Sequence, residues 1–376
     1  MEANQQTDQV ASSQLAGMTG LGDSPSIPTE LQGPGVLPRL RKIALIIAAS
    51  GFLLMVVGAS YQSIKARADA RRFPPEGKSV DVGGYMLNIN CTGHGSPTVI
   101  LESGLAVPAI SWRSVQPEIA KFTRVCSYDR AGYDWSDPGP MPRTTAQSVK
   151  ELHRLLHNAG EEPPYVLVGH SFGGTSVRIY NGIYPGEVIG MVLADTGHED
   201  LKFPDNFQKL VDAELKQRQH DRKWAQLLYW FGISRFMASA RIDNPAFSYD
   251  EQEWSYFTIQ PKFIGAAASE LENLNEGKDE LRAAGTLGDK PLIVLIAQES
   301  LLDLPLTSQD KTNLHNLWVD LEMRLAHLSS RGKWVIVPDT GHMIPFERPD
   351  AIVSAVQEVC ANAKLHSLLS VSWPSP

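Results

Sequence analysis

The sequence lacks the short motifs that mark several common classes of function. It contains no C-x-x-C, no H-E-x-x-H and no phosphate-binding P-loop, so it indicates neither a metal site nor a nucleotide cradle. The formal net charge is −8 at pH 7, and no basic face argues for nucleic acid. We therefore expect no metal, no cofactor and no nucleic-acid partner.

Lysine and arginine are absent from residues 1–38, which are rich in Gln, Ser, Gly, Thr and Pro. Such a segment cannot bury enough apolar surface to fold, so it predicts a disordered tail. Charge of either sign is absent from residues 43–60, which as a helix would be roughly 27 Å long, enough to cross a bilayer. We expect a single transmembrane helix within 39–62, with the lipid bilayer as its partner. Basic residues lie on both sides of it in nearly equal number, so the side of the membrane that holds the rest of the chain stays open.

A short linker is expected after the apolar run. The linker is expected over residues 63–77, whose last part, R-R-F-P-P-E-G, is stiffened by Pro74 and Pro75. The next residues, 78–91, alternate apolar and polar side chains on both sides of Gly83-Gly84, which is typical of a β-hairpin. The folded domain is therefore predicted to begin at residue 78.

Beyond the hairpin, short apolar strands alternate with amphipathic helices. The expected strands are 98–101, 124–128, 165–168, 188–194, 291–297 and 333–337. This alternation predicts an α/β fold with a doubly wound, mostly parallel sheet, built from residues 78–195 and 291–365. The intervening segment 196–290 is helical and aromatic and too long for a loop, so it predicts a helical cap insertion. Residues 366–376 are expected to be a C-terminal tail.

One stretch carries the strongest chemical signal. The apolar residues 165–168 run into Gly169-His170-Ser171-Phe172-Gly173, the G-x-S-x-G pattern of a nucleophile elbow. In such an elbow the serine has a strained backbone, and Gly169 and Gly173 stand where a Cβ would strike a neighbouring strand or helix. The helix that follows directs its N-terminal amides at the serine, where negative charge develops during acyl transfer. Ser171 is thus the candidate nucleophile.

With these motifs in place, the sequence resembles the serine members of the α/β-hydrolase superfamily, of the esterase and lipase kind with a helical cap. The elbow is joined by a D-R-x-G-x-x-x-S loop in which Asp134 stands where the family has glycine, and by a late D-T-G-H with F-E-R-P after it. The segments that carry the resemblance are 102–105, 129–136, 169–174, 339–342 and 346–349. The resemblance covers about residues 78–365.

A serine hydroxyl needs a general base, and the resemblance points to His342, which follows a strand end and a glycine. The acid that orients this histidine is less determined by the residues. Asp195 ends the strand 188–194, and a carboxylate at a strand end is held more firmly than one on a loop, so we favour it. Asp303 and Glu299 remain open as alternatives. A Ser–His–Asp catalytic triad of Ser171, His342 and Asp195 is therefore expected.

The resemblance also suggests supporting roles. The oxyanion hole would be formed by the backbone amides of Phe172 and Leu105. His170 is expected to be structural or to line the pocket, and Asp129 with Arg130 to form a buried ion pair that holds the loop's backbone amides.

The three cysteines are Cys91, Cys126 and Cys360. In the family's strand order the strands of Cys91 and Cys126 are neighbours, so these two residues can meet as a disulfide, which would place the domain outside the cytoplasm, while buried free thiols remain equally compatible.

Two hypotheses on function follow. The first is a membrane-anchored, single-pass serine hydrolase that cleaves a small ester-like substrate through an acyl-enzyme. A serine nucleophile argues against the dehalogenases and epoxide hydrolases of this fold, which use a carboxylate. The second is a ligand-binding or receptor module on a hydrolase scaffold with little turnover.

Overall fold

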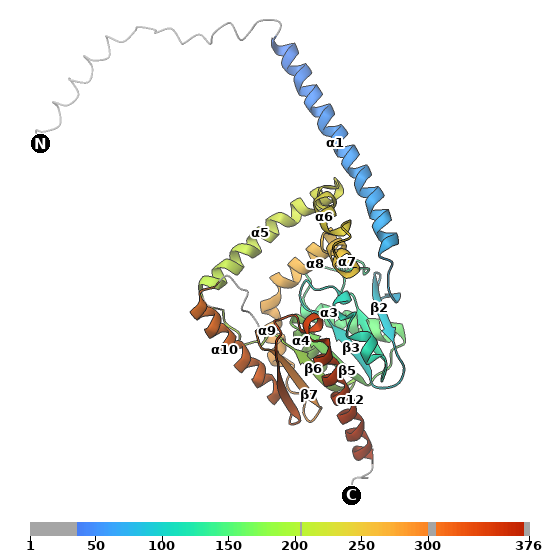
Figure 1. The fold of residues 1–376 in the computed structure, drawn as a ribbon, viewed down its shortest axis with the longest axis vertical. Coiled ribbons are helices and arrows are strands. Elements are labelled where there is room, and N and C mark those ends of the chain that lie inside the picture. The colour runs from blue at the N-terminus through green and yellow to red at the C-terminus, as the bar shows by residue number, and fades with distance from the viewer. Residues whose placement is uncertain (1–35, 204, 300–305, 372–376) are drawn as a thin grey trace, which may run out of the picture. The chain divides into compact units, whose positions relative to one another are not determined.

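The computed structural model describes residues 36–203, 205–299 and 306–371. The chain divides into one unit that ends at Val57 and a second that begins at Gly58. Helix α1 (Val36–Arg72) passes from the first unit into the second (Figure 1). Of the tail predicted for 1–38, residues 1–35 lie outside the described residues.

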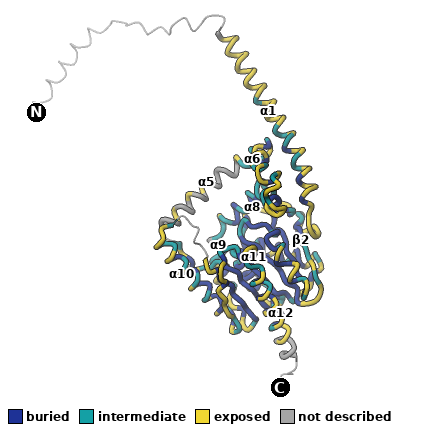
Figure 2. Tube along the Cα trace, viewed as in Figure 1, coloured by how far each residue is buried: buried dark blue, intermediate teal, exposed yellow. Residues whose placement is uncertain are grey.

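The first unit is the N-terminal part of α1, which is exposed along its length (Figure 2). Among the described helices, α1 is the one that is long and apolar enough to cross a membrane. It extends ten residues beyond the end expected at residue 62, so the prediction of a linker from 63 was wrong for 63–72. Residues 63–72 contain neither Gly nor Pro, and Gln62 and Asp69 are buried in the second unit, so tertiary contacts prolong the helix.

The second unit is built on an eight-stranded sheet in the order β1-β2-β4-β3-β5-β6-β7-β8. The first two strands form the predicted antiparallel hairpin and β2 is antiparallel to β4, whereas the remaining pairs are parallel. The strands are β1 (Lys78–Asp81), β2 (Met86–Thr92), β3 (Thr98–Glu102), β4 (Val125–Tyr128), β5 (Tyr165–His170), β6 (Val188–Ala194), β7 (Leu292–Ala297) and β8 (Gly332–Val337). The mostly parallel α/β sheet is confirmed.

Helices cover both faces of this sheet, because the parallel strands are apolar on both sides. In β5, Leu167 packs with α3 and α4 on one face, and Val166 and Val168 pack with α12 on the other. The covering helices and short turns are η2 (Ala109–Trp112), α2 (Gln116–Ile119), α3 (Thr145–Ala159), α4 (Phe172–Ile183), α10 (Ser308–Leu325), η3 (Ala326–Leu328), α11 (Ile344–Glu347) and α12 (Pro349–Val371). Helix α12 continues through 366–371, so a tail from residue 366 was wrong for these residues, and 372–376 lie outside the described part.

The segment between β6 and β7 is helical, as expected for 196–290. It contains α5 (Asp205–Trp230), α6 (Ile233–Ile242), α7 (Tyr249–Thr258), α8 (Pro261–Glu272) and α9 (Leu274–Ala283). The ring of Phe263 on α8 lies 4.7 Å from that of Tyr133, and the ring of Trp254 on α7 lies 5.7 Å from that of Phe346. The cap therefore covers the loops that follow β4 and β8 (Figure 1).

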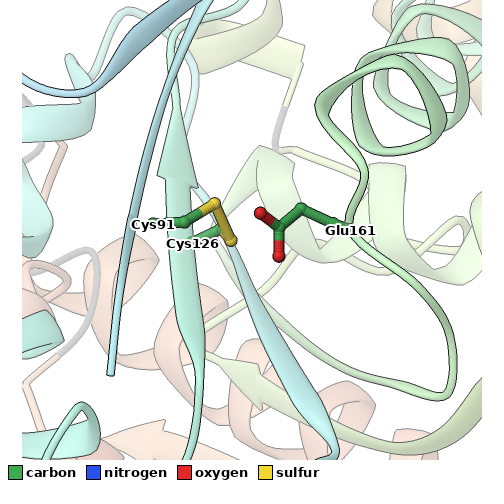
Figure 3. Close-up of side chains that lie close together, drawn as sticks. All are labelled: Cys91, Cys126 and Glu161. Atoms are coloured by element: carbon green, nitrogen blue, oxygen red, sulfur yellow. A yellow bond between two sulfur atoms is a disulfide. The ribbon is translucent and has the colours of Figure 1, made fainter. Parts of the chain in front are cut away.

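Cys91 and Cys126 are direct partners in the β2–β4 ladder and form a disulfide. Glu161 lies beside them (Figure 3), so two sulfurs and a carboxylate come together as they would around a metal ion. Sulfurs bonded to each other are not thiolate ligands, however, and Glu161 accepts hydrogen bonds from Arg124 at 2.6 and 2.7 Å. The disulfide and this ion pair account for the cluster. The third cysteine, Cys360, is buried and free.

Candidate active site

Ser171 lies on the sharp turn between β5 and α4. Its backbone has φ 53° and ψ −123°, a left-handed conformation that costs energy for a residue with a side chain. The turn is held by a hydrogen bond from the Ser171 N–H to the Ala194 carbonyl (3.1 Å) and one from the Thr196 hydroxyl to the Ser171 carbonyl (2.6 Å). The strained elbow that G-x-S-x-G predicts is present.

The two glycines of the motif are required by close packing. A Cβ on Gly169 would lie 2.6 Å from the backbone of Gly173, at the start of α4. A Cβ on Gly173 would lie 2.3 Å from the carbonyl oxygen of Glu102, at the end of β3. Both distances are shorter than any real contact of a Cβ atom, so only glycine lets helix and strand approach the serine this closely.

His342 and Asp195 meet at this turn from distant parts of the chain. The His342 Nε2 atom is 2.9 Å from the Ser171 Oγ, and its Nδ1 atom is 2.6 Å from the Asp195 Oδ2. An Nδ1–H that donates to the carboxylate leaves Nε2 as an acceptor for the serine hydroxyl. The structure thus brings together the three residues expected to form the triad.

Asp195 is fully buried, and other groups fix its orientation. Its Oδ1 accepts hydrogen bonds from the Ala297 N–H and the Trp318 Nε1–H, both at 3.0 Å. Of the two alternative acids, Asp303 lies outside the described residues. Glu299 is exposed, and its N–H donates to the Thr340 carbonyl at 2.9 Å. Within the described residues Asp195 occupies the position beside the histidine Nδ1.

The loop that carries His342 is supported from two sides. On one side, Glu347 accepts hydrogen bonds from the Gly341 N–H (2.5 Å) and the Thr340 hydroxyl (2.9 Å), which gives the F-E-R-P segment a physical role. On the other, the His170 Nε2 lies 2.8 Å from the carbonyl oxygen of His342. Burial, together with the nearby His342, lowers the pKa of His170 to about 4. His170 is therefore neutral at neutral pH and donates this hydrogen bond, in line with the structural role expected for it.

The residues expected to form an oxyanion hole lie beside the serine. Phe172 is the first residue of α4, where a backbone N–H has no partner within the helix. Leu105 follows Gly104, and a Cβ on Gly104 would lie 3.2 Å from the Ser171 Cβ. The loop after β3 thus passes next to Ser171.

Arg130 connects this loop with the cap, and here the expected ion pair was wrong. Its guanidinium pairs with Glu102 at 2.8 Å and with Glu270 of α8 at 2.9 Å, instead of with Asp129. It also donates to the carbonyls of Ser103 (2.7 Å) and Gly104 (2.8 Å). A loop amide is held by Asp129 instead, whose Oδ2 accepts a hydrogen bond from the Trp135 N–H at 3.4 Å. Arg130 points toward the loop after β3 because the buried carboxylates of Glu102, at the end of β3, and Glu270, on α8, pair with its guanidinium.

Asp134, which replaces the family's glycine, has a φ of 34°, and this explains why glycine suits the position. Its carboxylate accepts a hydrogen bond from the Ala109 N–H at 3.1 Å. Burial and the neighbouring Asp129 raise the pKa of Asp134 well above its usual range, and burial raises that of Asp129 to about 7. Lys262 of α8 donates to the carbonyls of Asp134 and Ser136 and so joins the cap to this loop.

A cavity of about 500 Å³ lies between α7 and the histidine loop. Met343, the residue after His342, lines it. Its other apolar lining residues are Ile110, Phe247, Trp254 and Phe346. This cavity is large enough to hold an apolar group of a small substrate.

Several residues around the site carry no signal in the sequence. Trp318 and Glu322 come from α10, and Glu270 comes from the cap, each more than a hundred residues from the group that it contacts. Glu322 is buried, accepts a hydrogen bond from the Thr196 N–H, and has its pKa raised well above its usual range by burial and by Asp195. A tryptophan or glutamate on an amphipathic helix looks the same whether or not it reaches the site.

The sequence and the structure of the chain are similar to those of known proteins. The model of the family described as "Alpha/beta hydrolase family" matches residues 93–355. The "AB hydrolase superfamily protein" of Gibberella zeae is 34% identical over 291 residues, which cover 70% of this chain and 86% of that protein. The uncharacterized protein YbdG of Bacillus subtilis is 27% identical over 269 residues, or 69% and 79% of the two chains. The crystal structure of a putative lipase from Acinetobacter baumannii superposes with a TM-score of 0.57 at 18% identity, over 81% of this chain and 97% of that one.

Proposed function

Since the chain belongs to the alpha/beta hydrolase family, we propose that it is a membrane-anchored serine hydrolase that cleaves carboxylic esters. The observation that carries the proposal is the chain of two hydrogen-bond distances, 2.9 Å from Ser171 Oγ to His342 Nε2 and 2.6 Å from His342 Nδ1 to Asp195 Oδ2. This arrangement is the one that makes a serine hydroxyl nucleophilic at neutral pH.

The reaction proceeds in two halves. Ser171 Oγ attacks the ester carbonyl while His342 Nε2 takes the hydroxyl proton, and Asp195 stabilises the imidazolium that forms. The negative oxygen of the tetrahedral intermediate accepts hydrogen bonds from the N–H groups of Phe172 and Leu105. His342 then gives its proton to the departing alcohol, which leaves an acyl-serine. In the second half a water molecule loses its proton to His342, attacks the acyl carbon and releases the acid, and Ser171 regains its proton.

The cavity supports an ester with an apolar acyl or alcohol group. Met343, the residue after His342, is one of its lining residues, and tryptophan and phenylalanine side chains line it as well. Such a wall gains free energy from apolar groups, at about 25 cal/mol for each Å² removed from water.

Helix α1 supports the anchor. Its residues 43–60 are apolar and uncharged, and an 18-residue window of α1 has a mean hydropathy of 2.4, with none of that window buried in the protein. An exposed apolar helix of this length is stable in lipid and costly in water. The protein should remain in the membrane pellet after an alkaline carbonate wash.

A fluorophosphonate probe tests the hydrolase. It phosphonylates a serine only where the hydroxyl is activated, so the wild-type protein is labelled and Ser171→Ala is not, whereas the exposed Ser308→Ala on α10 is labelled as the wild type is. Turnover of p-nitrophenyl acetate should follow the labelling. Absence of both labelling and turnover in the folded wild type would instead favour a ligand-binding module on this scaffold.

A further inference from the structure

Helix α6 presents apolar side chains to the outside. Ile233, Phe236, Met237 and Ala240 are spaced as one face of a helix, and all are exposed, Phe236 at 70% and Met237 at 72%. The opposite face holds Arg235 and Ile242, both buried. A helix on a water-soluble body usually exposes its charged residues and buries its large apolar ones, whereas α6 exposes large apolar residues and buries an arginine.

The end of α5 exposes apolar side chains as well. Trp224, Leu227 and Trp230 are spaced by three residues and are also exposed, Trp230 at 66%. The turn Phe231-Gly232 joins the two helices. We call the exposed side chains of this helix pair the elbow face: Trp224, Leu227, Trp230, Ile233, Phe236 and Met237. An exposed apolar patch of this kind marks a site of contact with another apolar surface.

The turn Phe231-Gly232 between α5 and α6 packs against the part of α1 that belongs to the second unit. A Cβ on Gly58 would lie 2.2 Å from the Phe231 carbonyl oxygen, and one on Gly232 would lie 2.9 Å from the Tyr61 ring. The two backbones are thus in direct contact. Because Gly58 is only two residues from the end of the apolar run 43–60, the turn lies where that run ends.

Ion pairs fix this contact further along α1. Arg235 donates to both oxygens of Asp69, at 2.6 and 3.1 Å, and both side chains are buried. Arg235 also pairs with Asp243 at 2.8 Å, and Asp243 pairs with Lys65 of α1 at 3.1 Å. A bidentate buried pair of this kind fixes the rotation of α6 against α1, so the elbow face cannot turn inward without breaking it.

We infer that the elbow face inserts into the interface of the lipid bilayer. The inference rests on the proposed membrane anchor, because the turn Phe231-Gly232 contacts α1 where the apolar run of that anchor ends. Tryptophan is enriched at the boundary between lipid and water, and a helix with one apolar face lies in that boundary with this face in the lipid. The first charged residues beyond the run are Lys65 and Arg67, as expected where α1 leaves the membrane.

The cavity beside the histidine loop lies next to α6. Arg241, in the last turn of α6, lines the cavity beside the histidine loop together with Phe247. A cap that lies in the bilayer interface therefore brings this cavity close to the membrane surface. The substrates that fit this placement are esters that dissolve in lipid.

The test places an environment-sensitive label on the elbow face. Met237→Cys is labelled with a nitrobenzoxadiazole maleimide in the full-length protein and reconstituted in phosphatidylcholine vesicles that contain doxyl-labelled lipids. The matched control is Asp279→Cys on cap helix α9, a side chain that is 90% exposed. The wild-type protein, treated in the same way, measures labelling of the buried Cys360.

We expect a blue-shifted emission at position 237 and quenching by doxyl lipids roughly threefold stronger than at position 279, since an interfacial helix lies within the acyl boundary. Equal quenching at both positions, in protein that stays in the membrane pellet after a carbonate wash, would overturn the inference and leave the anchor standing. A blue shift without quenching would also overturn it, because protein would then cover the face. Protein that leaves the pellet would overturn the anchor together with the inference.

Discussion

Asp195 receives hydrogen bonds from His342, from the Ala297 N–H and from the Trp318 indole, so its two oxygens have separate partners. In Asp195→Asn a neutral amide replaces the carboxylate whose charge favours the Nδ1–H form of His342. The imidazole can then carry its proton on Nε2, which no longer accepts the proton of the serine. We expect kcat for p-nitrophenyl acetate to fall by about 10⁴ with the protein still folded.

The matched control for this variant is Glu299→Gln, which removes an exposed carboxylate near the same loop and should keep wild-type turnover. A near-normal kcat for Asp195→Asn would mean that another acid orients His342, and Asp303→Asn would then be the next variant to measure.

His170 makes stability depend on pH. Burial lowers its pKa in the folded protein to about 4, while the unfolded chain keeps the ordinary value of 6.5. Between these values the unfolded state binds more protons, so the contribution to stability is complete above pH 6.5 and is lost as the pH falls toward 4. The loss from pH 7 to pH 5 is about 2 kcal/mol.

The variant His170→Gln checks this, because an amide can still donate to the His342 carbonyl but does not titrate. Urea unfolding at pH 7 and pH 5 should show a smaller drop in the free energy of unfolding for His170→Gln than for the wild type. The exposed His157→Gln should behave as the wild type does. An unchanged drop in His170→Gln would show that other groups cause the pH dependence.

At the scale of elements, the cap and the loops around Ser171 are joined by buried charge. Glu270 of α8 accepts two hydrogen bonds from Arg130, and Arg130 in turn holds the carbonyls of Ser103 and Gly104 next to Ser171. In Glu270→Gln the guanidinium loses one of its two counter-charges in a dry environment. We expect a loss of about 3 kcal/mol in the free energy of unfolding.

The same change should lower kcat by roughly tenfold, because the loop that carries Leu105 is less firmly held, while KM changes little. Glu272→Gln, two residues further along α8 and exposed, is the matched control and should alter neither quantity. Stability lost without any change in kcat would limit the role of Glu270 to the packing of the cap.

The elements that could be predicted from the sequence are those that local signals define. Thr144 accepts a hydrogen bond from the Gln147 N–H at the start of α3 and Gly160 ends that helix with a left-handed backbone, as a cap residue and a terminal glycine indicate. The helical course of 63–72 was missed because Asp69 is stabilised there by Arg235, which lies far along the chain. In the site, Ser171 and His342 stand in recognisable motifs, whereas the partners of Arg130 depend on the packing of the cap.

At the scale of the whole molecule, the disulfide bears on orientation in the membrane. Cys91 and Cys126 are bonded in the sheet that carries the site. Disulfides persist in oxidising compartments and are rare in the cytosol. The charges that flank the apolar run do not decide the orientation, but the disulfide favours one in which the body from residue 78 onward lies on the non-cytoplasmic side and residues 1–38 lie in the cytoplasm.

Labelling of intact cells with a membrane-impermeant maleimide measures this orientation. Asp279→Cys, on the exposed surface of the cap, should react in intact cells, whereas Ser13→Cys should react only after the membrane is permeabilised. The native cysteines add little background, since two are bonded to each other and Cys360 is buried. The opposite pattern would place the body from residue 78 onward in the cytoplasm, where disulfides are rare, and Cys91 and Cys126 would then be free thiols on the neighbouring strands β2 and β4.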